Sequence, residues 1–340
     1  MTKEPECIVC KKPAGVVYRD FNGYVLGEVF NIYYCDGCDT SFVWPQLVDD
    51  RIYDKIYSQS AIVPGYNRYE LYARSITEKG NPLEYLSEKE PMYFAVNQIL
   101  KHASEKGIKI LEVGSGLGYL TYAIAQRGYD ITGLDISADA VNKAEKRFGK
   151  KYVCEDVYKY ALENSQKFQL IILTEVIEHV PDPYLFCKSL LELLKPGGKL
   201  IISTPNKSAF PQQEYWNTEL PPVHLAWFSE KSFIALSERL GLSYSFFDLS
   251  EFNKKHFDFT KYRFYENYNK RHQRIPTLNK NGEVLEPKSL IAENAFKKIQ
   301  KNIKAFIKSL LERIIISSPF VDKKNMDRSA FLCVILEKQI

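Results

Sequence analysis

The chain has 340 residues, 45% of them hydrophobic and 26% charged, a composition typical of a globular protein with one large domain or two smaller ones. No apolar run approaches the roughly 18–20 residues that a membrane-spanning helix requires. The N-terminal MTKEPECIVC lacks the layout of a secretory signal, so we expect a cytoplasmic protein. The net charge of +4 is too small to indicate nucleic-acid binding, and we predict no sequence-specific contact with nucleic acid.

Four of the seven cysteines form two CxxC pairs near the N-terminus, Cys7 with Cys10 and Cys35 with Cys38. A cytosolic chain seldom keeps disulfides, and each CxxC turn can direct two sulfurs at one ion. Four thiolates suit tetrahedral zinc with no open coordination position, so the predicted metal is structural. The stretch between the pairs has a hairpin pattern, which predicts a zinc ribbon over residues 1–48. A redox-active pair, or four unrelated cysteines, is the alternative.

From residue 108 onward, strand and helix patterns alternate, which predicts a parallel sheet covered by helices on both faces. In such an α/β fold, ligands bind outside the carboxyl ends of the strands. Strands are predicted over residues 108–113, 129–134, 152–154, 168–174 and 199–203. Helices are predicted over residues 116–127, 137–147 and 183–194, the last followed by a KPGG turn at 195–198.

A glycine-rich stretch, EVGSGLG, follows the first of these strands. A triphosphate-binding loop would need GxxxxGK[ST], and no lysine follows these glycines. A dinucleotide loop would need GxGxxG, but Tyr119 occupies the position of its third glycine. The spacing is instead G-x-G-x-G over Gly114, Gly116 and Gly118, preceded by the acidic Glu112.

Carboxylates end the next two strands. Asp135 follows the second strand, 21 residues after Gly114, where it can accept hydrogen bonds from both ribose hydroxyls. Asp156 follows the third strand, where a carboxylate can meet the adenine amino group. The predicted ligand therefore carries adenosine without a pyrophosphate.

This arrangement resembles the class I S-adenosylmethionine (SAM)-dependent methyltransferases over residues 108–250 and the last strand. The resemblance implies a doubly wound, mostly parallel, seven-stranded α/β sheet, completed by a sixth strand at 243–249 and an antiparallel seventh within 329–340. It also implies a helical cap over the cofactor mouth at residues 49–107. The cofactor-binding residues it implies are Glu112, Gly114, Ser115, Gly116, Gly118, Asp135, Ile136, Asp156, Val157, Thr174 and Glu175.

The segment FQLIILTEVIEHVPDP at 168–183 is similar to the fourth-strand motif of ubiquinone-biosynthesis methyltransferases, with Gln169 where that motif usually has Asp. In some relatives an acid–acid–His set binds a divalent cation here. The resemblance thus implies a candidate cation site at Glu175, Glu178 and His179. The alternative is that these side chains only fix the loop beneath the cofactor.

A long loop after the fifth predicted strand ends in PPVHLAWFSEKS. His224 is its only histidine and suits a general base near neutral pH, with His179 as a second catalytic candidate. Trp227 and Phe228 could wall an acceptor pocket, and Ser229 can cap the next helix. The order of zinc ribbon, glycine loop and HLxxFS resembles deoxysugar C-methyltransferases, although Val223 replaces the glutamate of their Glu-His pair. A histidine that only packs the loop is the alternative.

The C-terminal quarter is basic, with 19 lysines and arginines against 10 aspartates and glutamates over residues 251–340. Family topology makes 251–328 an insertion before the last strand. Apolar residues recur at helical spacing between Phe296 and Ile314, with lysines on the remainder. Such a helix can contact an anionic membrane surface, face a phosphorylated substrate, or pack on the core.

The sequence therefore predicts a SAM-dependent methyltransferase with one structural zinc. The predicted acceptor is an oxygen or carbon of a small molecule, above all a sugar, nucleotide sugar or glycan precursor. An RNA or protein methyltransferase that grips its substrate with the ribbon and the basic insertion is the second hypothesis. A non-catalytic SAM-fold scaffold is the third.

Overall fold

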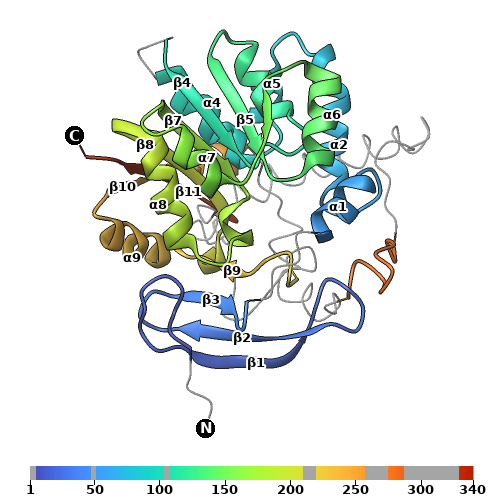
Figure 1. Cartoon of the computed structure of the whole chain (residues 1–340), viewed down its shortest axis with the longest axis vertical. Helices are drawn as coiled ribbons and strands as arrows, with labels where there is room; N and C mark the ends of the chain where they lie inside the picture. Colours follow the sequence, from blue (N-terminus) through green and yellow to red (C-terminus); the bar gives the residue numbers. More distant parts are fainter. Residues whose placement is uncertain are drawn as a thin grey trace, which may run out of the picture.

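We describe a computed structural model of the chain over residues 5–46, 51–102, 107–209, 220–256, 275–286 and 329–339. It contains a seven-stranded sheet flanked by helices and, at one end of the molecule, a four-stranded sheet (Figure 1). Among these residues, no helix combines the length and hydrophobicity that crossing a membrane requires. The predicted helix between Phe296 and Ile314 lies outside the described residues.

The large sheet has the strand order β10-β11-β8-β7-β4-β5-β6. Neighbouring strands run parallel except β11, which is antiparallel to both β8 and β10. The strands are β4 (Lys109–Val113), β5 (Asp130–Asp135), β6 (Tyr152–Cys154), β7 (Phe168–Thr174), β8 (Leu194–Pro205), β10 (Ser243–Phe246) and β11 (Phe331–Glu337). This topology confirms the predicted fold class and its antiparallel last strand.

The helices cover both faces of the sheet because successive strand residues point to opposite sides. Ile110 of β4 packs with Val96 and Leu120 on one face, while Leu111 packs with Leu190 on the other. The helices are α4 (Pro91–His102), α5 (Tyr119–Ala125), α6 (Ala138–Phe148), α7 (Val157–Glu163), α8 (Pro183–Leu193), α9 (Glu230–Leu240) and α10 (Ser250–Lys255).

The KPGG segment was predicted to be a turn before a strand. In the structure it lies within β8, which begins at Leu194. Leu194 pairs with Phe168 and Lys199 pairs with Leu170, so four residues of β8, 195–198, lie opposite the single residue Gln169 of β7 in a bulge. The bulge is held from the other side, where Gly197 donates a backbone hydrogen bond of 3.0 Å to the Lys338 carbonyl. Gly197 permits it with a φ of +73°, which L-residues rarely adopt.

The small sheet joins the N-terminal ribbon to a distant part of the chain. Its order is β1-β2-β3-β9, and β9 comes from the loop that follows β8 (Figure 1). Ser41 and Phe42 of β3 pair with Trp227 and Ala226 of β9. Its strands are β1 (Gly15–Asn22), β2 (Val29–Cys35), β3 (Thr40–Val43) and β9 (Ala226–Trp227).

Three helices precede β4, and they are α1 (Arg51–Ser58), α2 (Asn67–Ser75) and α3 (Pro82–Ser87). Arg68 of α2 contacts Glu175 just after β7, at the carboxyl ends of the strands. Glu84 of α3 instead pairs with Lys101 and Arg127 at the ends of α4 and α5. Lys143 of α6 donates a hydrogen bond of 2.8 Å to the Tyr57 carbonyl of α1. Arg147 of α6 pairs with the buried carboxylate of Glu70 in α2, at 2.5 Å. The cap is therefore anchored to the helix that follows β5.

We expect Gly118→Ala to destabilise the fold more than Gly128→Ala. Both residues have a left-handed φ, +79° and +87°, which costs a non-glycine residue about 1–2 kcal/mol. A Cβ at Gly118 would also lie 2.6 Å from the Ala144 Cβ and 2.7 Å from the Tyr152 ring, whereas one at Gly128 meets nothing within 4 Å. The added overpacking should cost about 1–3 kcal/mol. Denaturant unfolding without SAM measures both variants, and equal losses would contradict this reason.

Candidate cofactor site and histidine pair

The glycine-rich loop lies between the ends of β4 and β5. Gly114, Gly116 and Gly118 all have positive φ, at +74°, +49° and +79°. The backbone N–H groups of Gly114 and Ser115 both donate to the Leu134 carbonyl, at 2.8 and 3.1 Å. The loop is thus folded back on the neighbouring strand, and its conformation needs the glycines.

Asp135 joins this loop to the end of β5. Its buried carboxylate accepts hydrogen bonds from the Gly116 N–H, at 2.7 Å, and from the Ser137 N–H, at 2.9 Å. Each carboxylate oxygen can accept a further bond, so these contacts leave capacity for two hydroxyl groups. Burial raises the pKa of Asp135.

Two further polar groups beneath the loop fit a ligand site. Glu112 is buried at the end of β4 and accepts a hydrogen bond from the Thr121 hydroxyl. Burial raises the pKa of its carboxyl to about 8. The Ser115 hydroxyl is buried without a hydrogen-bond partner among the described residues, and such an orphaned group is what a bound ligand would satisfy.

The predicted adenine end lies on the far side of Asp135. Ile136 is 53% exposed there. Asp156 caps α7 by accepting from the backbone N–H groups of Tyr158 and Lys159, at 2.8 and 3.3 Å. The Val157 side chain packs in the core of the sheet, so only its backbone is available to a ligand.

The predicted cation set of Glu175, Glu178 and His179 is wrong as a cluster. Thr174 ends β7, and Glu175 follows it with a φ of +56° that turns the carboxylate toward the cap. Both of its oxygens lie 3.1 Å from the Arg68 Nη2 atom, and it also accepts from the Tyr69 hydroxyl. The possible ligand atoms that do come together belong to Glu178, His179 and His224, all within 4.8 Å of one another.

The structure brings the two candidate histidines into contact. Their rings lie 4.7 Å apart and are perpendicular. His179 belongs to the single turn η2 (Ile177–His179), and its Nδ1 lies 2.5 Å from the Val223 carbonyl, which implies that this nitrogen carries the proton. The Nδ1 atom of His224 is buried without a hydrogen-bond partner in the described part of the chain.

Burial keeps both histidines neutral. It lowers the pKa of His179, and it lowers the pKa of His224 well below the ordinary value, with the neighbouring His179 acting in the same direction. The nearby Glu178 accepts a hydrogen bond of 2.9 Å from the Thr204 hydroxyl. A neutral imidazole with an unused nitrogen can accept a proton.

Trp227 and Phe228, which were predicted to wall an acceptor pocket, are packed in hydrophobic clusters. Both are buried, Trp227 against the ribbon and Phe228 against the core of the large sheet. Trp227 belongs to β9, which pairs with β3, and Phe228 directly follows this strand. The sequence contained the signal only as an apolar AWF run beside the histidine.

The four ribbon cysteines converge as predicted. The Sγ atoms of Cys7 and Cys38 are 3.5 Å apart, those of Cys10 and Cys35 are 3.4 Å apart, and all four lie within 4.8 Å of one another. Zinc–sulfur bonds of about 2.3 Å in a tetrahedron place sulfurs about 3.8 Å apart. The cluster therefore fits a structural zinc ion.

The order of the strands, the glycine loop and Asp135 define a class of protein. Residues 88–244 match the family profile described as a methyltransferase domain. With the sheet topology, this match makes the central part of the chain a class I SAM-dependent methyltransferase domain.

Two curated relatives of the chain share one name. The chain is 37% identical over 108 residues to a "Ubiquinone biosynthesis O-methyltransferase" of Coxiella burnetii, covering 30% of this chain and 46% of that protein. It is 28% identical over 200 residues to a protein of that name from Stutzerimonas stutzeri, covering 52% of this chain and 85% of that protein. The first match thus spans less than half the length of the relative.

Among solved structures, a phosphoethanolamine N-methyltransferase 2 from Haemonchus contortus in complex with S-adenosyl-L-methionine superposes with a TM-score of 0.49 and 15% identity. The alignment covers 88% of this chain and 62% of that chain. Similarity at this level carries no information on the reaction.

We expect the protein to bind one zinc ion per chain. The Cys38→Ser variant should lose both the zinc ion and the fold of the ribbon. The Cys38 carbonyl accepts from the Ser232 hydroxyl of the core at 3.1 Å, so the loss should also disturb the loop that holds buried Trp227. Atomic absorption measures the metal, and tryptophan emission, shifted to longer wavelength, measures the loop. The exposed Cys154→Ser is the control. A metal-free preparation with a fully folded ribbon would contradict the zinc site.

We expect Glu112→Gln to flatten the pH dependence of stability. The pKa of Glu112 rises from 4.5 to about 8 on folding, so between these values the folded chain holds a proton that the unfolded chain has released. The free energy of unfolding therefore falls as pH rises through this window, by about 1.4 kcal/mol per pH unit for one group.

Denaturant unfolding without SAM at pH 5.5 and pH 8 measures this slope. The exposed Glu163→Gln should behave as wild type. A wild-type slope in Glu112→Gln would show that this carboxyl is ionised in the folded protein.

Proposed function

We propose that the protein transfers a methyl group from SAM to an oxygen of a small-molecule acceptor. The observation that carries this proposal is the glycine loop bonded to Asp135, which leaves carboxylate capacity for the ribose beside an orphaned serine hydroxyl. The matched methyltransferase domain supports the reaction. The name of the curated relatives supports oxygen as the receiving atom.

We assign the cofactor to this chain's residues as follows. Gly114, Gly116 and Gly118 allow its methionine part to approach bare backbone, and Asp135 accepts from the ribose hydroxyls. Glu112 lies beneath the loop, where a positively charged ligand favours its ionised form, and Asp156 meets the adenine at the rim. When bound, SAM supplies a methyl group that is already activated, so the protein mainly aligns the nucleophile behind it.

The histidine pair supplies the base. His224 takes the proton of the acceptor hydroxyl, since its buried Nδ1 is unused and its low pKa keeps it neutral. His179 holds the pair in place through its bond to the Val223 carbonyl. We further propose that the small-molecule acceptor is sugar-like, because the HLAWFS stretch resembles that of sugar methyltransferases.

We expect His224→Gln to lower methyl transfer by about 10²–10⁴-fold, the usual contribution of a general base, with the SAM dissociation constant unchanged. The assay follows label from methyl-labelled SAM into small molecules of a cell extract. The exposed His102→Gln, at the end of α4, is the matched control. Because burial lowers the pKa values of both site histidines, wild-type activity should also persist below pH 6.5. Unchanged turnover in His224→Gln would remove it from the mechanism.

A further inference from the structure

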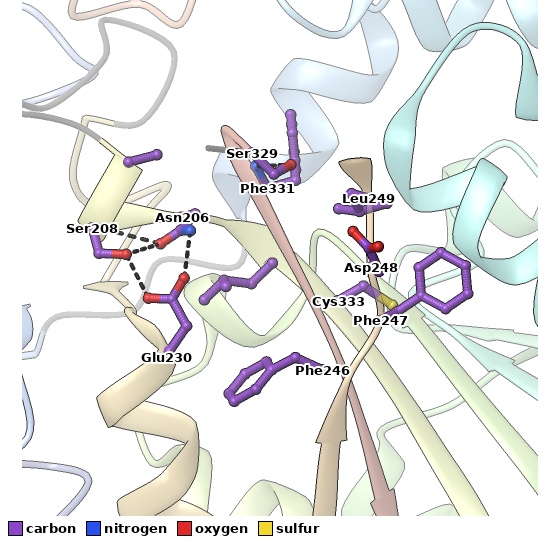
Figure 2. A pocket seen from close by; sticks show the side chains of 12 residues that line it. Asn206, Ser208, Glu230, Phe246, Phe247, Asp248, Leu249, Ser329, Phe331 and Cys333 are labelled. Atoms are coloured by element: carbon purple, nitrogen blue, oxygen red, sulfur yellow. Dashed lines mark hydrogen bonds between the residues drawn. The ribbon is translucent and has the colours of Figure 1, made fainter. Parts of the chain in front are cut away.

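A cavity of about 340 Å³ lies at the carboxyl edge of the large sheet, on the side away from the glycine loop. It is formed where β8 and β10 end and β11 begins (Figure 2). Asn206, Ser208 and Glu230 line one side, and Phe247 and Asp248 line the other, across β11. β7, which carries Glu175 at its end, lies between this region and the cofactor loop.

The end of β8 connects the cavity to the histidine cluster. Thr204 binds Glu178 of the histidine cluster, and Asn206, two positions on, lines the cavity. Alternate residues of an extended strand lie on one side, about 7 Å apart. A second connection runs through the chain that follows His224. The backbone N–H of Lys207 donates a hydrogen bond of 2.8 Å to the carbonyl of Phe228, four residues after His224. The lining residue Asn206 is thus one strand repeat from Thr204, whose hydroxyl donates to Glu178, and the Glu178 carboxylate lies within 4.8 Å of the His224 ring nitrogen.

The polar side of the cavity is a preorganised network. Asn206 donates to one oxygen of Glu230 at 2.9 Å, and Ser208 donates to the other at 2.5 Å. The backbone N–H of Ser208 donates to the Asn206 side-chain oxygen at 3.0 Å. These bonds fix the Glu230 carboxylate while leaving lone pairs for further donors. Rings of Phe246, Phe247 and Phe331 supply apolar surface.

The charge of the cavity selects against anions. Its lining contains two carboxylates, Glu230 and Asp248, and among its lining residues that the structure describes there is no lysine, arginine or histidine. A hydrogen bond from the Ser250 N–H lowers the pKa of Asp248, so this carboxyl stays ionised. A phosphate would face two negative charges without a counterion.

We propose that this cavity binds the methyl acceptor, as a small hydroxylated ring that bears no phosphate within it. Hydroxyl groups donate to Glu230 and Asp248, and the faces of the ring pack on the phenylalanines. The volume is near the lower end of the roughly 300–1,000 Å³ found for ligand sites, which suits one ring. This inference rests on the proposed function, and it narrows the acceptor from sugars in general to a sugar-like ring without an anionic group at this end.

The test uses the full chain, methyl-labelled SAM and the small-molecule fraction of a cell extract from the source organism, split on an anion exchanger. We expect the label in the unretained, non-anionic pool. Ala209→Trp fills the cavity and should reduce that label about a hundredfold, as misplacement of a substrate can do, with SAM binding unchanged. Leu162→Trp, on the exposed face of α7, is the control.

A second variant keeps the shape of the cavity. Glu230→Gln with Asp248→Asn removes both charges, and it should lower the label in the non-anionic pool about tenfold, the effect of losing one to two charge-assisted hydrogen bonds. Label in the anionic pool, or in protein, RNA or lipid, would overturn the inference. So would full activity in Ala209→Trp. Bound SAM with no label in any fraction would instead refute the proposed function itself.

Discussion

The pairing of β3 with β9 is the contact on which the arrangement of the site depends. Leu225, next to His224, accepts a backbone bond from Val43 of the ribbon at 2.9 Å and donates one to Glu178 of the core at 2.8 Å. The backbone of Leu225 is thereby hydrogen-bonded to both the ribbon and the core, and this restricts the backbone of the adjacent His224. Since about forty residues can hardly keep a fold without a staple, the four thiolates that organise the ribbon also bear on the geometry of the proposed base.

Desolvation sets the electrostatics on both sides of the site. It raises the pKa values of Glu112 and Asp135 and lowers those of the two histidines, so each of these groups is biased toward its neutral form. A positively charged ligand beneath the loop would favour the ionised carboxylates. The histidine pair stays uncharged without any ligand. The two halves of the site therefore respond differently to a cationic cofactor, although burial acts on both.

The sequence predicted what depends on short spacing. The glycine loop after β4, the acid that ends β5 and the two CxxC pairs are local features, and in the structure they lie where the sequence predicted them. The position of the Glu175 side chain could not be predicted from the sequence. Its backbone has a left-handed φ, and its carboxylate contacts Arg68, a residue 107 positions earlier in the chain. The burial of Trp227 could not be predicted for a similar reason, since it depends on pairing with the distant β3. The cavity draws its lining from three separate strand ends, which no single window of sequence brings together.

The shared sheet also bears on how such a protein can change over generations. The ribbon precedes the methyltransferase domain in the chain, yet one of its four strands is encoded nearly 180 residues later, at Ala226–Trp227. A recombination event near residue 48 would exchange three strands and leave the fourth behind, facing an unrelated edge. The four-stranded sheet is therefore encoded by two distant segments that must be inherited together. Substitutions at Ser41 and Phe42 should be tolerated only with matching changes in β9.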